Sequence, residues 1–410
     1  MPHEETPPEP GHGRLQFSLR SMLIGDIHDS PTRLVLAVSG GGSRAIVDLL
    51  QVPGASRSVL EAVVPYCPQA MIDWLGGPPD QFCSEPTARA MAMAAFRRAC
   101  RLVALAAGQP VDGVALAAGQ PVSLAGVACT ASLASDRPKR GPHRAHVAVQ
   151  TAAVTLSRSI ELQKGRRTRA GEEQLVSALV LNAVAGACGL AERVALDLLP
   201  EERVDEARHE APEPWQKLLA GSLGAVREGA SPGSADRVPR AVFPGSFHPL
   251  HDGHRRMARV ARERLGVPIE FEISIENVDK PPLDYLEIAR RLAQFDPAEA
   301  IWLTRAPTFE AKSAQFQGTT FVVGADTLRR IADGRYYAGG AAACGSAFAQ
   351  IAGRACRFLV FGRPDAGRFL GLADLELPPV LRAICDEVPA SEFCEDVSST
   401  ELRRSGQAGE

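Results

Sequence analysis

Apolar runs of strand length alternate with amphipathic segments throughout the second half of the chain. Strands are predicted near residues 240–243, 269–275, 299–304, 319–324 and 357–361, and helices near residues 252–265, 284–295, 308–316, 325–333 and 399–405. Because strand-then-helix repetition builds parallel sheets, the pattern predicts ligand binding at the carboxyl ends of these strands. Residues 338–355 are rich in small residues, and their pattern is too weak to predict an element.

The first half of the chain also mixes strand and helix patterns, so the fold class predicted for the whole chain is α/β. Strands are predicted near residues 34–38, 125–130 and 144–150. The segment "SEPTARAMAMAAFRRACRL" predicts a long helix with Ser84 as its N-cap, and "GEEQLVSALVLNAVAGACGLAERVALDLL" predicts a second helix. The stretch "VALAAGQPV" occurs twice, at 103–111 and 114–122. We expect this tandem copy to be a loop extension at the surface, because Gly-Gln-Pro ends both helices and strands.

Length and composition divide the chain into two domains, since 410 residues are too many for one ordinary core. Residues 227–239 are rich in Gly, Ser, Pro and charge and predict a linker. They separate an N-terminal α/β domain, residues 31–226, from a C-terminal domain, residues 240–410. Residues 1–30 open with the acidic, proline-rich "MPHEETPPEPGHG" and are expected to be a disordered tail.

The net charge, the apolar runs and the cysteine spacing exclude several classes of function or location for this chain. A net charge of −3 argues against a general nucleic-acid surface, so any anion site is local. No apolar run reaches the length of about 18 residues that a membrane span needs. The nine cysteines are scattered and never spaced as CxxC, which is typical of reduced thiols in the cytoplasm.

Residues 243–257, "FPGSFHPLHDGHRRM", hold three of the nine histidines within seven positions, where a predicted strand runs into a predicted helix. Gly245 and Ser246 allow the backbone to approach a ligand closely, and the free amides of the helix start favour an anion. His251 and His254 flank that helix start, and each can donate a hydrogen bond to a phosphate. Metal binding is the alternative interpretation of the HxxH spacing, but no Glu or Cys partner stands at the spacing of a zinc protease. The segment therefore predicts a phosphate site.

Two motifs and three internal blocks resemble a known superfamily. The stretch "GSFHPLHDGH" resembles the GxFxPxHxGH signature of the HxGH nucleotidylyltransferases, and "VSSTELR", residues 397–403, resembles their second motif, ISSTxxR. Between them, "VDKPPLDYLEIARRL", "FVVGADTLRRI" and "FLVFGRP" resemble blocks of the nicotinamide- and nicotinate-nucleotide adenylyltransferases. The resemblance covers about 240–406 and implies a Rossmann-like fold. It also implies that a mononucleotide phosphate attacks the α-phosphorus of a nucleoside triphosphate, and that pyrophosphate leaves.

The resemblance assigns roles residue by residue. His251 and His254 would hold the triphosphate, with His254 nearest to the α-phosphate, and Arg403 would add a fixed cation. The other nucleotide-binding positions that it implies are Gly245, Ser246, Phe247, Gly253, Ser398, Ser399 and Thr400. Three more nucleotide-binding assignments each have a structural alternative. Lys280 could instead be a solvated lysine, Asp326 could be a helix N-cap, and Arg363 could be a lone arginine with no ligand. Mg²⁺ would bridge the phosphates of ATP, although the sequence shows no dedicated carboxylate cage for it.

The motif details favour ATP and a pyridine mononucleotide as substrates. Cytidylyltransferases of the superfamily tend to have Arg-Thr-x-Gly before the second motif, and this chain has "CEDV" there. Pantetheine-phosphate adenylyltransferases usually have Thr where His251 stands. His248 departs from the Asn or Asp that is frequent at its position. A cytidylyltransferase and a non-catalytic nucleotide-binding scaffold remain the alternatives, and the sequence does not distinguish the amide from the acid form of the mononucleotide.

The first domain resembles the competence-damage-inducible family over about 33–200, and that family's C-terminal domain is a nicotinamide-nucleotide amidase. Ser39 matches the serine nucleophile and Tyr66 matches a tyrosine of the motif, but Met71 stands in place of its lysine. A serine needs a nearby base, and no histidine lies near Ser39 in sequence, although His143 or His146 could approach it in space. We therefore expect an inactive amidase domain that dimerises, giving a homo-oligomer, or that binds a pyridine nucleotide. Its glycines at 40–42 would allow anion binding at the following helix.

Overall fold

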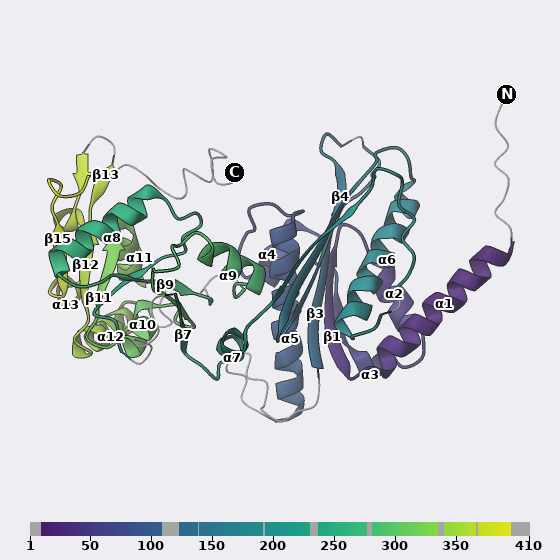
Figure 1. Ribbon diagram of the computed structural model, residues 1–410, viewed down its shortest axis with the longest axis horizontal. Coiled ribbons are helices and arrows are strands. Elements are labelled where there is room, and N and C mark those ends of the chain that lie inside the picture. The colour runs from purple at the N-terminus through teal and green to yellow at the C-terminus, as the bar shows by residue number, and fades with distance from the viewer. Residues whose placement is uncertain are drawn as a thin grey trace. The chain divides into compact units, whose positions relative to one another are not determined.

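The computed structural model describes residues 10–108, 123–137, 139–191, 193–229, 237–276, 281–334, 340–365 and 368–394 (Figure 1). The chain forms two compact units, Met1–Gln216 with Asp279–Leu286, and Lys217–Val278 with Glu287–Glu410. Each unit has its own sheet with helices packed against it, so the prediction of an α/β chain with two domains is confirmed.

The first unit is built on a mixed six-stranded sheet with the order β2-β1-β3-β4-β5-β6. The strands are β1 (Thr32–Ser39), β2 (Val59–Val63), β3 (Ser123–Ser132), β4 (His143–Thr151), β5 (Val154–Leu162) and β6 (Val204–Glu210). Strand β1 runs parallel to β2 and β3, and the pairs from β3 to β6 are antiparallel. The helices are α1 (Pro10–Asp29), α2 (Arg44–Gln51), α3 (Ala55–Ser58), α4 (Pro68–Leu75), α5 (Glu85–Ala106), α6 (Arg169–Ala187) and α7 (Glu213–Ala220), which ends in the second unit.

Helices cover both faces of this sheet, which makes the first unit a three-layer sandwich. Alternate residues of β1 point to opposite faces: Leu36 and Val38 pack with α1, α2 and α6, while Ala37 packs with α4 and α5. Figure 1 shows α5 and α6 on opposite sides of the strands. Ser84 caps α5 as predicted, because its side chain accepts a hydrogen bond from the Thr87 amide.

Two expectations for the first unit need correction. The tail predicted for residues 1–30 contains α1 over residues 10–29, and Leu23, Ile24 and Ile27 on one side of this helix are buried in the core. The second long helix, α6, ends at Ala187, and the described residues of 190–199 are not helical. The helix ends because Gly189 has a positive φ of 75° and a Schellman pair of hydrogen bonds closes the last turn.

A short segment from the second half of the sequence belongs to the first unit. Its described part, residues 281–286, is held by an ion pair in which the Nη1 atom of Arg89 lies 2.5 Å from the Oδ1 atom of Asp284, and both side chains are buried. The Tyr285 hydroxyl donates to the carbonyl oxygen of Ala152 at 2.6 Å. The unit therefore includes a piece of chain that the pattern alone assigned elsewhere.

The second unit contains a seven-stranded sheet with the order β15-β12-β11-β8-β9-β10-β7. Its strands are β7 (Ala225–Glu228), β8 (Ala241–Pro244), β9 (Glu270–Ser274), β10 (Ile301–Thr304), β11 (Thr320–Gly324), β12 (Arg357–Phe361) and β15 (Cys385–Val388), with a separate hairpin of β13 (Arg363–Asp365) and β14 (Arg368–Leu370). Its helices are α8 (Asp252–Leu265), α9 (Tyr285–Leu292), α10 (Phe309–Gln315), α11 (Ala325–Ala332), α12 (Gly340–Gly353) and α13 (Pro379–Arg382). The first two residues of α9 belong to the first unit.

All strand pairs of this sheet are parallel except β7 with β10. From β8 the chain proceeds to β9 and β10 on one side, and then returns to the other side of β8 for β11, β12 and β15. This is the strand order of a Rossmann-like sheet, and such a sheet binds ligands where the order reverses, at the carboxyl ends of β8 and β11. The five strands predicted for this half are confirmed.

Three details of the second unit differ from the predicted layout. Strand β7 lies within 225–228, so the sheet already includes the first residues of the segment 227–239 that was predicted to be a linker. Helix α12 occupies the small-residue stretch for which no element was predicted. The helix predicted for 399–405 lies outside the described residues. No helix in the described ranges is long and apolar enough to cross a membrane.

Strand β3 packs closely against the main chain of α5 at Gly126, which leaves no room for a side chain there. A Cβ atom at this position would lie 2.1 Å from the carbonyl oxygen of Ala92 and 2.2 Å from the amide of Phe96. We predict that Gly126→Ala destabilises the protein by about 1–3 kcal/mol, because main-chain atoms cannot move aside as a side chain can. Chemical denaturation followed by circular dichroism measures this change. Gly141→Ala is the control, since nothing lies within 4 Å of its added methyl, and equal denaturation midpoints for the two variants would contradict the prediction.

Candidate functional site

The loop between β8 and α8 begins at Gly245, where the neighbouring ring of Phe247 leaves no space for a side chain. The Gly245 amide donates to the carbonyl oxygen of Glu272 at 2.9 Å, which continues the pairing of β8 with β9. A Cβ atom on Gly245 would lie 2.6–2.9 Å from the ring of Phe247. Glu272 is itself fixed, because its buried carboxylate lies 2.6 Å from the Nζ atom of Lys312. The first turn of the loop is therefore anchored to the centre of the sheet.

Phe247 is the buried anchor of the loop. Its side chain is 1% exposed and packs against Phe243, Phe271 and Phe295, with ring centroids 5.4–5.5 Å apart. The ring also makes an edge contact with His254, at 5.1 Å and 77°. Its φ of 43° is unusual for a bulky residue. Such a backbone conformation costs about 1–3 kcal/mol of strain energy. The aromatic cluster and the loop must together offset this strain.

His251 and His254 form a stacked pair at the start of α8. His251 is the N-cap, and the two ring centroids lie 3.7 Å apart with the planes inclined by 28°. The His251 amide donates to the Nδ1 atom of His254 at 3.3 Å. Since Nδ1 accepts this bond, the proton of the neutral His254 ring is on Nε2, which can donate to a ligand. The pair lies at the carboxyl end of β8 and at the first turn of α8.

The environment of His254 favours its neutral form. Burial, with a smaller contribution from the nearby His251 ring, lowers the pKa of His254 to about 3. Near pH 7 the ring is therefore an uncharged hydrogen-bond donor, and a bound polyphosphate would supply the charge in a charge-assisted bond worth about 1.5–3 kcal/mol.

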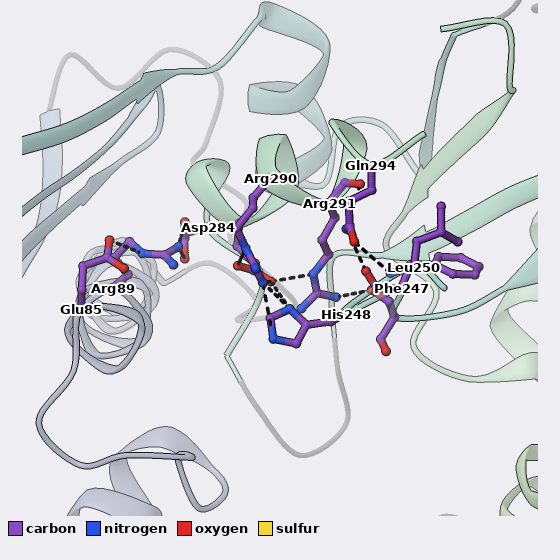
Figure 2. A network of polar contacts seen from close by, with 11 residues as sticks. Glu85, Arg89, Phe247, His248, Leu250, Asp284, Arg290, Arg291 and Gln294 are labelled. Carbon is purple, nitrogen blue, oxygen red and sulfur yellow. Dashed lines mark hydrogen bonds and ion pairs between the residues drawn. The ribbon is translucent and has the colours of Figure 1, made fainter. Parts of the chain in front are cut away.

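Helix α9 and the residues after it hold the main chain of this loop (Figure 2). The Gln294 side chain donates to the carbonyl oxygen of Phe247 at 3.0 Å and accepts from the amide of Leu250 at 2.8 Å. The Nη1 atom of Arg291 donates to the carbonyl oxygen of Ser246 at 2.9 Å. Sequence reasoning did not identify these residues, because their partners are main-chain atoms, which leave no trace in the residue letters.

A carboxylate on α9 organises the charges beside the loop. Glu287 lies 2.7 Å from the Nε atom of Arg291, 2.9 Å from Arg290 and 3.1 Å from the Nδ1 atom of His248. Burial alone would raise the pKa of Glu287, but hydrogen bonds from His248 and Arg290 and the charge of Arg291 outweigh it and hold the pKa far below its usual range. His248, the residue that departs from the superfamily pattern, therefore contacts α9.

Asp326 and Arg363 meet at the carboxyl edge of the same sheet. Asp326 is in the first turn of α11 after β11, Arg363 follows β12, and the Nε atom of Arg363 lies 2.9 Å from the Oδ2 atom of Asp326. Gly324, and not Asp326, is the N-cap of α11, so the N-cap interpretation of Asp326 is wrong. The two predicted residues are brought together as a half-exposed ion pair.

The remaining predicted residues of the second unit lie outside the described part of the chain. They are Lys280, Ser398, Ser399, Thr400 and Arg403. The prediction that the second motif and the histidine pair contact one triphosphate therefore stays a prediction. Gly253 lies in the first turn of α8 and is buried.

The serine predicted as a degenerate nucleophile lies at the end of β1 in the first unit. The Ser39 hydroxyl donates to the carbonyl oxygen of Pro65 at 3.0 Å, and Ser39 is 8% exposed. Tyr66 is 72% exposed, and Met71 is buried in the core formed with α4 and α5. In the described structure, neither histidine proposed as a base bonds to Ser39. His143 bonds to Glu172 at 2.7 Å, and His146 bonds to Ser159 at 2.8 Å.

Strand register explains why His146 does not reach Ser39. Ser39 pairs with Thr130 of β3, and Thr130 pairs with His146 of β4, so two strand spacings of about 4.8 Å each separate the two residues. The Nδ1 atom of His146 is bonded to Ser159 on β5, the strand on the far side of β4 from Ser39. His143 is an odd number of residues from His146, and its side chain therefore points to the opposite face of the sheet.

The start of α2, where the glycines predicted anion binding, already holds a carboxylate. Glu173 accepts hydrogen bonds from the amides of Gly42 and Arg44 at 3.0 and 3.1 Å, and from the Ser43 hydroxyl at 3.1 Å. Arg169 donates to the same carboxylate at 3.0 Å. Burial acts to raise the pKa of Glu173, but these hydrogen bonds outweigh it and lower the pKa. The predicted anion position is filled by the protein's own side chain.

Within the described ranges, no three His, Cys, Asp or Glu side chains cluster so as to hold a metal ion. The carboxylate at the candidate site, Asp326, is paired with Arg363 and lies 3.7 Å from Arg329.

Comparison with known proteins gives a family match in the second half of the chain. Residues 242–405 match the model of a family described as cytidylyltransferase-like. A "Probable nicotinate-nucleotide adenylyltransferase" from Gloeobacter violaceus is 29% identical over 186 residues, which cover 41% of this chain and 84% of that protein.

Solved structures that resemble this chain include two competence-damage proteins. The competence/damage inducible protein CihA from Agrobacterium tumefaciens has 20% identity and a TM-score of 0.29, covering 42% of this chain and 92% of that one. A CinA superfamily protein from Escherichia coli has 16% identity and a TM-score of 0.28, covering 45% and 92%.

We predict that His254 stays uncharged down to about pH 5. Because the folded protein has a pKa of about 3 at this residue, against 6.5 for an ordinary histidine, only the unfolded chain binds the proton between these values. The contribution of His254 to the free energy of unfolding therefore decreases as the pH falls through this window. NMR titration of the imidazole Cε1 proton, assigned by its absence in His254→Gln, measures the pKa. A midpoint above pH 6 would contradict the prediction.

Proposed function

We propose that residues 242–405, a cytidylyltransferase-like domain, transfer an adenylyl group from ATP to nicotinamide or nicotinate mononucleotide. The observation that carries the proposal is the stacked His251–His254 pair at a helix start, where the order of a parallel sheet reverses. The nucleotide-adenylyltransferase relative supports the adenylyl group and the pyridine acceptor. The product would be a dinucleotide of NAD biosynthesis.

In the proposed reaction, an oxygen of the mononucleotide phosphate attacks the α-phosphorus of ATP. The bond from that phosphorus to the oxygen bridging the α- and β-phosphates breaks, and pyrophosphate leaves with the electron pair. The protein's part is to position the reactants and to stabilise charge on the phosphoryl oxygens. His254 would donate from Nε2 to an α-phosphate oxygen, and His251 and the first amides of α8 would bind the neighbouring phosphates.

Further residues of the proposed site would bind the two nucleotides. Gly245 and Ser246 would let the triphosphate approach the main chain closely. Asp326 and Arg363, which pair at the ends of β11 and β12, would contact the nucleotides from the other side of the switch point. The residues of the second motif, including Thr400 and Arg403, would bind the β- and γ-phosphates. Mg²⁺, carried on the triphosphate, would lower its charge, and every other step relies on the chain's own groups.

Two alternatives remain open to direct test. A cytidylyltransferase would use CTP, and a nucleotide-binding scaffold would release no pyrophosphate with any acceptor. The full-length protein is incubated with Mg²⁺ and ATP or CTP, together with nicotinamide mononucleotide, nicotinate mononucleotide and other phosphorylated acceptors, and pyrophosphate release is measured. We expect release with ATP and a pyridine mononucleotide.

We predict that His254→Ala lowers kcat/KM by at least about 10²–10³-fold, because it removes one preorganised donor to the reacting phosphate. The fold should persist, since the aromatic cluster around Phe247 keeps its three other rings. Arg259→Ala is the matched control, because Arg259 is an exposed residue of the same helix. A His254→Ala rate within tenfold of the wild-type rate, with the control also unchanged, would rule out this role for His254.

We predict that the first unit does not hydrolyse the amide of nicotinamide mononucleotide. The Ser39 hydroxyl donates a hydrogen bond to the carbonyl oxygen of Pro65, and the two histidines proposed as bases are bonded to other residues. Ammonia release is measured for the full-length protein and for Ser39→Ala. The expected result is the same background rate for both proteins, and release that depends on Ser39 would overturn the prediction.

A further inference from the structure

We infer that Gln294 is a positioning residue for the transfer reaction, and that it acts by fixing the loop that presents the two histidines. The inference rests on the proposed function of the second unit. Gln294 follows α9 and contacts the loop through both atoms of its amide group. Figure 2 shows this side chain and Arg291 directed toward the loop.

The two bonds of Gln294 span the most constrained part of the loop. Its Nε2 atom donates to the carbonyl oxygen of Phe247 and its Oε1 atom accepts from the amide of Leu250. Together they close the turn between a residue at positive φ and the residue before the N-cap of α8. Because a strained conformation persists only where its surroundings enforce it, these bonds help to fix Phe247 in place.

The position of Leu250 bears directly on the histidines. His251 is the next residue, and its amide donates to the ring of His254, so the orientation of both imidazoles follows from the path of the chain at Leu250. Arg291 fixes the other end of the loop by donating to the carbonyl oxygen of Ser246, and Glu287 orients the Arg291 guanidinium. Three polar groups of the loop main chain are thus bonded to side chains of one segment, residues 287–294.

The hydrogen bonds by which Gln294 fixes the loop are distinct from the apolar contacts that stabilise the fold. The ring of Phe247 packs against three other phenylalanine rings, and none of these contacts involves Gln294. Loss of the amide should therefore leave the core intact while the loop main chain gains freedom. A displacement of about 1 Å at reacting groups costs on the order of 10²-fold in rate, so a loosened loop should reduce kcat more than substrate binding.

The test compares Gln294→Met, which keeps the length of the side chain without its hydrogen bonds, with Gln294→Glu, which keeps the acceptor for Leu250 but loses the donor for Phe247. Gln350→Met on α12 is the matched control, because Gln350 is exposed and its side chain bonds to Arg354. Each full-length protein is assayed for kcat and KM with ATP and mononucleotide, for thermal unfolding, and for amide hydrogen exchange of residues 245–251.

We expect Gln294→Met to lower kcat by 10–100-fold, to change each KM by less than threefold and to speed exchange in residues 245–251, with an unfolding temperature near that of the control. Gln294→Glu should fall between Gln294→Met and the wild type. Unchanged exchange in the loop, or a kcat within twofold of the wild-type value, would overturn the inference. If the wild-type protein transfers no nucleotide to any acceptor, the proposed function fails, and the exchange measurement still decides whether Gln294 fixes the loop.

Discussion

The buried ring of Phe247 is the contact on which the candidate site depends. The ring occupies the space that a side chain on Gly245 would need, and it makes an edge contact with His254. Its burial also holds the main chain of Phe247 at a positive φ, between β8 and α8. Apolar burial fixes the ring, and polar bonds from residues 287–294 fix the main chain on either side of it. The histidine pair is therefore presented by a loop with two independent supports, one in the core and one at the surface.

The neutral state of His254 follows from the same packing. A ring wedged beside Phe247 and stacked on His251 is poorly solvated, so charge is disfavoured until an anion arrives. Such a group can bind a phosphate without first losing a strong interaction with a protein carboxylate. Arg363, in contrast, already pairs with Asp326, and any contact that it makes with a nucleotide must compete with that pair.

The sequence predicted five strands of the second unit, but not β7 or β15, and it predicted the strand-loop-helix at 243–257, because apolar period and small residues are local signals. It missed α12, since a helix of small residues has little amphipathic contrast, and it extended α6 beyond Gly189, whose positive φ ends the helix. The bonds of Gln294 could not be predicted, because they join a side chain to main-chain atoms 44–47 residues away. Nor could sequence alone show that Glu173 would take the anion position of the first unit.

That carboxylate changes what the first unit can bind. Glu173 is attached to α6, and α6 packs against the sheet that carries the glycine turn, so the carboxylate behaves as a tethered competitor with a high effective concentration. A free phosphate or carboxylate ligand would have to displace it and leave Arg169 to find a new partner. The glycine turn is therefore blocked by the protein itself. Its amides bind Glu173 and so link α2 to α6, and a diffusible anion would find these donors already occupied.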